Sequence, residues 1–458
     1  MRKSLVVPLL AALAGCAFQS YSSKPIDAQQ TAAAFDERSV TDPSLREYLQ
    51  SHGVVEWPVA NWGLHELTLL AFYYHPDLEL ARANAALARA QEFTARQPLN
   101  PGFEVLPEYH SLTEWRSPWS LHFQAQIPVV TQGKREIAAE QAGYLAQAAE
   151  LNVGNTAWQV RNRLRSRLLD AFAAREDLRL LRAESADRNE TLKLLEKRVA
   201  VGMIASHETA IARERALDAA LRLERRQGQL EEALAGIAEA LGLPQREARS
   251  LELKLDAFRE APPIDDFAAA KREALINRLD IRRSLLEYAA AEAALQLEIA
   301  RQYPDFNLKP GYAFDQDDNV WSLGLALVLP LLNKNEGPIR EAQERREIKA
   351  REFLALQSQV IAQSESAATR YEAARAELLK AEELTRLAEV QNEATKSRFD
   401  AGEADRLDLV NARLAVTSAQ QAKTAAAIRL QHARGALEDA LQRPVFTGAF
   451  DLPAVTRR

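Results

Sequence analysis

The second half of this chain repeats the first half at a spacing of about 200 residues, and this duplication constrains the fold more than any other feature. Six markers recur in the same order along the chain. They are His75-Pro76-Asp77-Leu78 with Arg278-Leu279-Asp280-Ile281, Pro101-Gly102-Phe103 with Pro304-Asp305-Phe306, Trp119-Ser120-Leu121 with Trp321-Ser322-Leu323, Pro128 with Pro330, Arg198-Val199-Ala200-Val201-Gly202 with Arg398-Phe399-Asp400-Ala401-Gly402, and Pro244 with Pro444. A unit of this length is far too long for a solenoid repeat, so the chain carries one structural arrangement twice.

Each half begins with a helical stretch and continues with two segments that alternate apolar and polar residues. We expect strands over about 102–112, 119–128, 305–315 and 320–330, because period-two alternation marks a strand with one apolar face. Segments of about ten residues match a tilted membrane strand, which needs roughly 9–11 residues. A half-buried soluble sheet would show the same alternation. On the membrane interpretation, the water-facing residues are Glu104, His110, His122, Gln124, Gln126, Asn307 and Lys309.

A very long helix follows each strand pair. No proline interrupts residues 129–243 or 339–443, and apolar residues recur there at helical spacing between charged ones. A helix from residue 134 to 201 would extend for about 100 Å at roughly 1.5 Å per residue. Gly202 and Gly402 suit a chain reversal at the helix end. Ser206 and Asp405 are then the expected N-caps of the returning helices.

The composition argues against a compact enzyme. The 458 residues are 47% hydrophobic and carry a formal charge of −6, which favours neither a disordered chain nor a nucleic-acid partner. One cysteine excludes an internal disulfide framework and a Cys-based zinc site. His65-Glu66 and His207-Glu208 lack the second histidine of a zinc motif, and there is no phosphate-binding GxxxxGK loop. We therefore expect no catalytic residues, no resident metal and no cofactor.

The first residues read as an export signal. A basic start and a short apolar run over residues 1–15 are typical of a secretory signal peptide. Leu13-Ala14-Gly15-Cys16 also resembles the bacterial lipobox, which implies lipidation of Cys16; an ordinary signal peptide with a chance cysteine is the alternative. We expect a lipid-anchored leader over 16–60 that is irregular and mostly polar, and an outer-membrane address in a Gram-negative cell.

Four membrane strands cannot close a barrel, because known barrels begin at about eight strands. Unpaired strand edges are costly in lipid, so other copies of the chain must complete the sheet. Two copies would give eight strands and a filled lumen, whereas three would give twelve strands and room for a channel. The long helices would continue the same tube below the membrane.

These features together resemble the TolC family of outer-membrane efflux proteins. The duplication, the Pro128 and Pro330 junctions, and the tip motifs Arg198-x-x-x-Gly202 and Arg398-Phe399-x-x-Gly402 carry the resemblance. It implies a mainly α fold with a membrane β-barrel part: a homotrimer with a twelve-strand barrel on a long α-helical barrel. It also implies a periplasmic adaptor protein and an inner-membrane pump, of the RND type, as partners. Two segments are similar to the heavy-metal (CzcC-like) branch: Ile127-Pro128-Val129-Val130 before Gly133-Lys134-Arg135, and Leu329-Pro330-Leu331-Leu332-Asn333-Lys334-Asn335-Glu336-Gly337-Pro338-Ile339.

The resemblance places adaptor docking at the two helical tips, around Arg198, Gly202, Arg398 and Gly402. Asp405 and Asp408 could form acidic rings at the periplasmic entrance, or Asp405 could cap its helix while Asp408 supports the first turn. His207-Glu208-Thr209 departs from the leucine-rich helix start that is usual in the family, so gate contacts in the first half do not transfer in detail.

The expected organisation places the two repeats over 61–243 and 268–442, with waist segments over 244–267 and 443–458. The function that follows is a passive outer-membrane duct for small solutes. The resemblance to the heavy-metal branch implies divalent heavy-metal cations as the cargo. The alternatives are a duct for drugs or secreted polypeptides and a non-channel coiled-coil lipoprotein scaffold.

Overall fold

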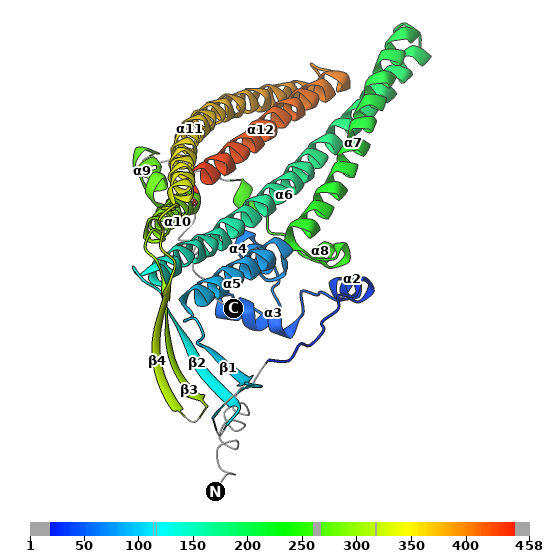
Figure 1. Cartoon of the computed structure of the whole chain (residues 1–458). Helices are drawn as coiled ribbons and strands as arrows, with labels where there is room; N and C mark the ends of the chain where they lie inside the picture. The colour runs from blue at the N-terminus through cyan, green and yellow to red at the C-terminus, as the bar shows by residue number, and fades with distance from the viewer. Residues whose placement is uncertain (1–18, 113, 116, 260–266, 317, 445–458) are drawn as a thin grey trace.

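The computed structural model describes residues 19–112, 114–115, 117–259, 267–316 and 318–444. In these residues both halves of the chain have the same order of elements, helix, two strands, long helix and returning helix (Figure 1). The first half contains α5 (Pro76–Arg96), β1 (Gly102–Tyr109), β2 (Trp119–Val129), α6 (Lys134–Ala200) and α7 (Ser206–Leu241). The second contains α10 (Leu279–Ala300), β3 (Phe306–Asp315), β4 (Asp318–Leu327), α11 (Glu336–Asp400) and α12 (Arg406–Leu441). The duplicated arrangement expected from the sequence is confirmed.

The four strands form one antiparallel sheet in the order β1-β2-β3-β4. The sheet lies at one end of the molecule, and the two helical hairpins extend away from it (Figure 1). β2 of the first half pairs with β3 of the second, with Ser120 opposite Asp315 and Val129 opposite Phe306. The central pair therefore joins the two halves, while β1 and β4 are the edges of the sheet.

Both long helices begin and end with matching backbone conformations. α6 has 67 residues and α11 has 65, so each extends for about 100 Å. Gly133 precedes α6 and Asn335 precedes α11, both in the left-handed conformation with φ of 62°. Gly202 (φ 73°) and Gly402 (φ 77°) reverse the chain at the far ends, where glycine avoids the steric cost of positive φ.

The four helices of the two hairpins, together with α5 and α10, lie side by side and form what we call the wall. Near the tips, α6 packs against α7 on one side and α12 on the other, and α12 packs against α11. Near the sheet, α6 packs between α5 and α10, and α10 packs against α11. The outer helices of the wall are thus α5 and α7 along one edge and α11 along the other. Among the described residues, no helix has the length and hydropathy needed to cross a membrane.

A hydrophobic core stabilises the middle of the wall, at the level we call the waist. Leu67 and Leu70 of the short helix α4 (Leu64–Tyr74) share this core with Leu164 and Leu168 of α6, and all four are fully or almost fully buried. α9 (Phe267–Asn277) packs on α11 and α12 in a second, smaller cluster. Two shorter elements, α8 (Gln245–Arg249) and a 3-10 turn at Asp256–Phe258, also lie in the waist connector.

The leader is more ordered than the sequence suggested. It contains two helices, α2 (Ala28–Asp36) and α3 (Pro43–Ser51), each with an aspartate N-cap, Asp27 or Asp42. Leu45 and Leu49 of α3 are completely buried in the core. The expectation of an irregular leader was wrong here, because polar composition concealed two capped helices, of which α3 has a buried face. The signal peptide, Cys16 and residues 445–458 of the C-terminal segment lie outside the described residues.

Candidate functional site: helical tips, ionic seam and polar sheet face

The returning helix α12 begins with a reciprocal cap. Asp405 Oδ1 accepts hydrogen bonds from the backbone N–H of Leu407 at 2.7 Å and of Asp408 at 3.0 Å. Asp408 Oδ2 accepts from the backbone N–H of Asp405 at 3.1 Å. The predicted capping role of Asp405 is confirmed. Ser206 is not the cap of α7, because that helix has Ala205 as its N-cap residue, with no side-chain cap bond, and already includes Ser206.

The cap of α12 also joins the two halves of the chain. The Arg198 guanidinium donates to Asp405 Oδ2 at 2.6 Å. The backbone hydrogen bond from Asp408, and then Arg198, hold the pKa of the Asp405 carboxyl below its usual range. The Arg198 and Asp405 side chains are 34 and 51% exposed, so solvent screens the pair and it adds little stability. The geometry supports the capping role; the acidic ring of Asp405 and Asp408 stays a prediction.

A row of ionic contacts continues from this point between α6 and α12; we call it the ionic seam. Arg406 Nε donates to Glu190 at 2.6 Å, and Arg413 lies 2.7 Å from Asp187 and also pairs with Glu190. Gln421 donates to Glu184 at 2.9 Å. The carboxylates on α6 therefore face cationic or amide groups on α12.

The seam shifts the pKa values of its carboxyl groups in opposite directions. Burial is the largest influence on Asp187 and raises its pKa. Burial also acts to raise the pKa of Glu190, but hydrogen bonds from Arg406 and Arg413 outweigh it and lower the pKa. The ion pairs keep Glu190 charged where α6 and α12 meet.

The two tip turns have the same hydrogen bonding and open surroundings. The backbone N–H of Met203 donates to the Arg198 carbonyl at 2.9 Å, and that of Glu403 donates to the Arg398 carbonyl at 2.8 Å. Apart from the glycine and its two chain neighbours, no atom of the described residues lies within 4 Å of where a Cβ would stand on Gly202 or Gly402. The tips therefore present backbone turns to the outside, as a docking surface would require; that role stays a prediction.

All seven polar residues expected to share one face of the sheet do share it. Glu104 stands opposite Gln124, and Lys309 lies opposite Gly324 on the same face. The other face carries large apolar side chains, among which Trp321, Leu323 and Leu325 are 80, 77 and 60% exposed. The sheet thus has one polar and one apolar face, as the period-two alternation predicted.

A short polar network lies on the polar face and was not singled out from the sequence. His110 Nε2 is 3.0 Å from Ser120 Oγ, which donates to Asp315 Oδ1 at 2.5 Å. His122 Nε2 is 3.5 Å from Glu108. In a catalytic triad the histidine stands between serine and aspartate, whereas here the serine stands in the middle, so this line cannot activate the hydroxyl. The alternation pattern predicts this shared face: Glu108, Ser120 and His122 occupy even positions of β1 and β2, His110 directly follows β1, and Asp315 pairs with Ser120.

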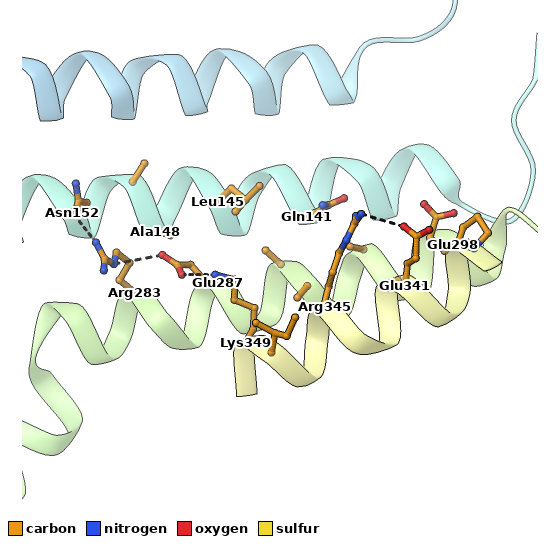
Figure 2. A pocket seen from close by; sticks show the side chains of 17 residues that line it. Gln141, Leu145, Ala148, Asn152, Arg283, Glu287, Glu298, Glu341, Arg345 and Lys349 are labelled. Atoms are coloured by element: carbon orange, nitrogen blue, oxygen red, sulfur yellow. Dashed lines mark hydrogen bonds and ion pairs between the residues drawn. The ribbon is translucent and has the colours of Figure 1, made fainter. Parts of the chain in front are cut away.

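A groove of about 680 Å³ lies between α6, α10 and α11 (Figure 2). Arg283 donates to Asn152 at 2.8 Å, and Lys349 donates to Glu287 at 3.3 Å, so the groove's charges cross-connect the three helices. Alanines of α6, α10 and α11 contribute to its lining. The paired charges give the groove a structural role. Within the described ranges, no three His, Cys, Asp or Glu side chains are grouped to hold a metal ion.

A two-faced sheet that continues into helices of about 100 Å is the arrangement expected of an outer-membrane channel protein. The family model described as outer membrane efflux protein matches residues 70–243 and 271–442, the two halves of the duplication. The chain belongs to this outer membrane efflux protein family. It is therefore an outer-membrane channel protein that extends into the periplasm, and not an enzyme.

The individual relatives share about a quarter of their aligned residues with this chain. The cobalt-zinc-cadmium resistance protein CzcC of Cupriavidus metallidurans is 26% identical over 305 residues, which cover 63% of this chain and 69% of CzcC. The pyoverdine export outer membrane protein OpmQ of Pseudomonas aeruginosa is 24% identical over 284 residues, covering 60% of this chain and 58% of OpmQ. The crystal structure of the outer membrane protein VceC of Vibrio cholerae has the same fold, with a TM-score of 0.68 at 22% identity over 84% of this chain and 99% of VceC.

Proposed function

We propose that three copies of this chain form a passive duct through the outer membrane. The observation that carries the proposal is the sheet itself, which has one apolar face, one polar face and two open edges, β1 and β4. Open edges are not stable in lipid, and antiparallel pairing of β4 with β1 of the next copy removes them. Three copies give twelve strands, enough for an open lumen. The apolar face then meets lipid, and the polar face lines the lumen.

The duct works with a periplasmic adaptor protein and an inner-membrane pump of the RND type. The support is the tip geometry, in which two open turns at Gly202 and Gly402 stand at the end opposite the sheet. Arg198 and Arg398 lie one turn before these glycines. Lipidation of Cys16 would add a second attachment to the outer membrane.

The proposed cargo is a divalent heavy-metal cation. The similarity to CzcC, a cobalt-zinc-cadmium resistance protein, supports this choice. Similarity to OpmQ, a pyoverdine export protein, favours a larger organic solute as the second candidate. A passive lumen selects little, so the pump would decide between them.

Deletion of the gene tests the substrate class. Growth is measured across zinc, cobalt, cadmium, nickel, copper and silver, alongside a panel of dyes and antibiotics. Selective loss of tolerance to one or two metals supports the metal proposal. Unchanged metal tolerance with increased dye or drug sensitivity retains the duct and rejects the metal cargo.

Conductance of the purified protein in planar lipid bilayers tests the duct itself. A trimeric duct inserts and conducts ions, whereas a coiled-coil lipoprotein scaffold gives no conductance. Reproducible insertion without any conductance, by protein that sediments as a trimer, would contradict an open lumen.

A further inference from the structure

The two edge helices of the wall carry exposed aliphatic strips near the tips. On α7, Ile211, Leu217 and Leu221 are 47, 66 and 59% exposed. On α11, Leu384, Leu387 and Val390 are 52, 52 and 59% exposed. We call these the α7 strip and the α11 strip.

Each strip lies on the side of its helix that faces away from the rest of the chain. On α7 the buried residues of this region are Ala212, Ala216 and Ala219, which at roughly 100° per residue lie opposite Leu217 and Leu221. On α11, Thr385 donates to the carbonyl of Ala419 on α12, and the α11 strip lies on the other side. Both strips therefore border the wall, one on each edge.

The duplication shows what such strips pack against. At the offset of 200 residues defined by Gly202 and Gly402, the α11 strip occupies the positions of Glu184, Asp187 and Glu190 on α6. At the same offset, Leu217 and Leu221 of α7 occupy the positions of Thr417 and Gln421 on α12. The α11 strip thus corresponds to the α6 side of the ionic seam, and Leu221 corresponds to its α12 member Gln421. The seam's Arg413 corresponds to Arg213 of α7, which pairs instead with Glu196 of its own chain at 3.0 Å.

One pair of these counterparts is in direct contact within the chain, because Glu184 accepts a hydrogen bond from Gln421 at 2.9 Å. Where α6 carries acids, the α11 strip carries aliphatic residues. Where α12 carries Thr417 and Gln421, the α7 strip also carries aliphatic residues. Two surfaces that pack together are expected to be both polar or both aliphatic. An aliphatic residue that faced a carboxylate would leave the charge without a partner.

We infer that the α11 strip of one copy packs against the α7 strip of the next, with Leu384 beside Leu221 and Leu387 near Leu217. The inference rests on the proposed trimer and specifies where its copies meet. α11 and α7 run antiparallel, as α6 and α12 do, so the contact repeats the ionic seam with aliphatic side chains. The tube then alternates an ionic seam inside each chain with an apolar seam between chains, and only the ionic one is screened by salt.

Disulfide cross-linking in outer membranes tests this contact. Leu221→Cys with Leu384→Cys should give bands of twice and three times the chain mass after oxidation, on non-reducing gels. Glu184→Cys with Gln421→Cys is the matched control, because it should cross-link within one chain and leave the mass unchanged. Each single variant should remain at the mass of one chain, which also controls for Cys16.

The native mass of the detergent-extracted wild-type protein separates the two levels of the proposal. A trimer whose Leu221→Cys/Leu384→Cys variant yields only single-chain bands would overturn the apolar seam and leave the duct standing. A monomeric wild-type protein would overturn both. Leu217→Cys with Leu387→Cys provides a second pair, so that failure of the first to assemble does not remove the test.

Discussion

At the residue scale, a few polar side chains add contacts between segments that lie far apart in the sequence. Lys134 donates to Asp305 at 2.8 Å beside the sheet, and Arg198 donates to Asp405 at the tips. At the waist, Arg38 of the leader donates to the carbonyls of Tyr74 and Gly242 at 3.0 and 2.7 Å. Each contact ties a helix end to the other half or to the leader.

Gly242 is expected to tolerate substitution less well than Gly202. Both have positive φ, so Gly→Ala costs each about 1–2 kcal/mol. A Cβ on Gly242 would also lie 2.8 Å from the Tyr74 carbonyl oxygen, whereas the space beside Gly202 is open. Crowding in a packed site adds about 1–3 kcal/mol. Thermal midpoints of the extracted proteins should therefore fall further for Gly242→Ala; equal midpoints would contradict the close approach.

Asp405→Ala should loosen the start of α12 by about 1 kcal/mol, the usual worth of an N-cap. Hydrogen exchange at the amides of Leu407 and Asp408 measures the change. Asp405→Asn is the control, because asparagine retains the cap acceptor but not the charge that meets Arg198. Unchanged exchange in the alanine variant would show that the cap does not hold the tip.

The Asp405 carboxyl should make the stability of the folded protein depend on pH. Its pKa in the folded protein lies below the ordinary value of about 3.9. Its charge therefore contributes fully above that value, and the contribution is lost as pH falls through the lower folded pKa. The stability difference between wild type and Asp405→Asn should be constant from pH 5 to 8 and shrink below about pH 4. A difference that grows on acidification would contradict the sign.

At the element scale, each strand and helix has one face assigned to an apolar surface and one to water. The register places Leu325 and Leu327 on the face of Leu323, and Ala326 opposite Asn307 on the polar face. Because a one-residue shift exchanges the faces, neighbouring positions on β4 should respond very differently to charge.

Leu325→Asp with Leu327→Asp should block assembly in the outer membrane, since charge on a lipid-facing strand costs energy in the bilayer. The trimer recovered from outer-membrane fractions is the readout. Ala326→Asp, on the polar face of the same strand, should assemble nearly as well as wild type. Normal trimers from the double variant would refute the lipid-facing assignment.

At the scale of the whole molecule, the sheet and the tips lie at opposite ends of the wall, so changes at one end should leave the other intact (Figure 1). This separation makes the two ends independently testable.

Gly402→Val should reduce efflux while leaving the trimeric barrel assembled. A β-branched residue opposes the positive φ that the tip turn requires. Gly402→Asn is the matched control, because asparagine adopts this conformation more readily. Growth under the stress identified by gene deletion, together with cross-linking to the adaptor, provides the measurement. Wild-type efflux in the valine variant would remove this tip from the docking surface.

Much of the fold could be predicted from the sequence because its signals are local. Period-two alternation identified the four strands and their polar residues, and the absence of proline with a terminal glycine identified the long helices. Asp405 was recognisable as a cap, but Ser206 was not excluded, since a serine before a helix reads the same one position early or late. The buried helix α3 was missed because its two leucines become a signal only when α4 lies beside them.

The sequence by itself determined the duplication, the element order and the two-faced strands, because spacing and alternation are properties of the chain alone. Tertiary structure decided which residues of the two halves meet. The ionic seam joins Asp187 and Glu190 to Arg406 and Arg413, more than 200 positions later, and no local pattern selects those partners. Tertiary structure also determined which aliphatic residues are buried and which form the exposed strips of α7 and α11. Composition is similar in both, and only the position of a helix in the wall determines which of its faces is covered.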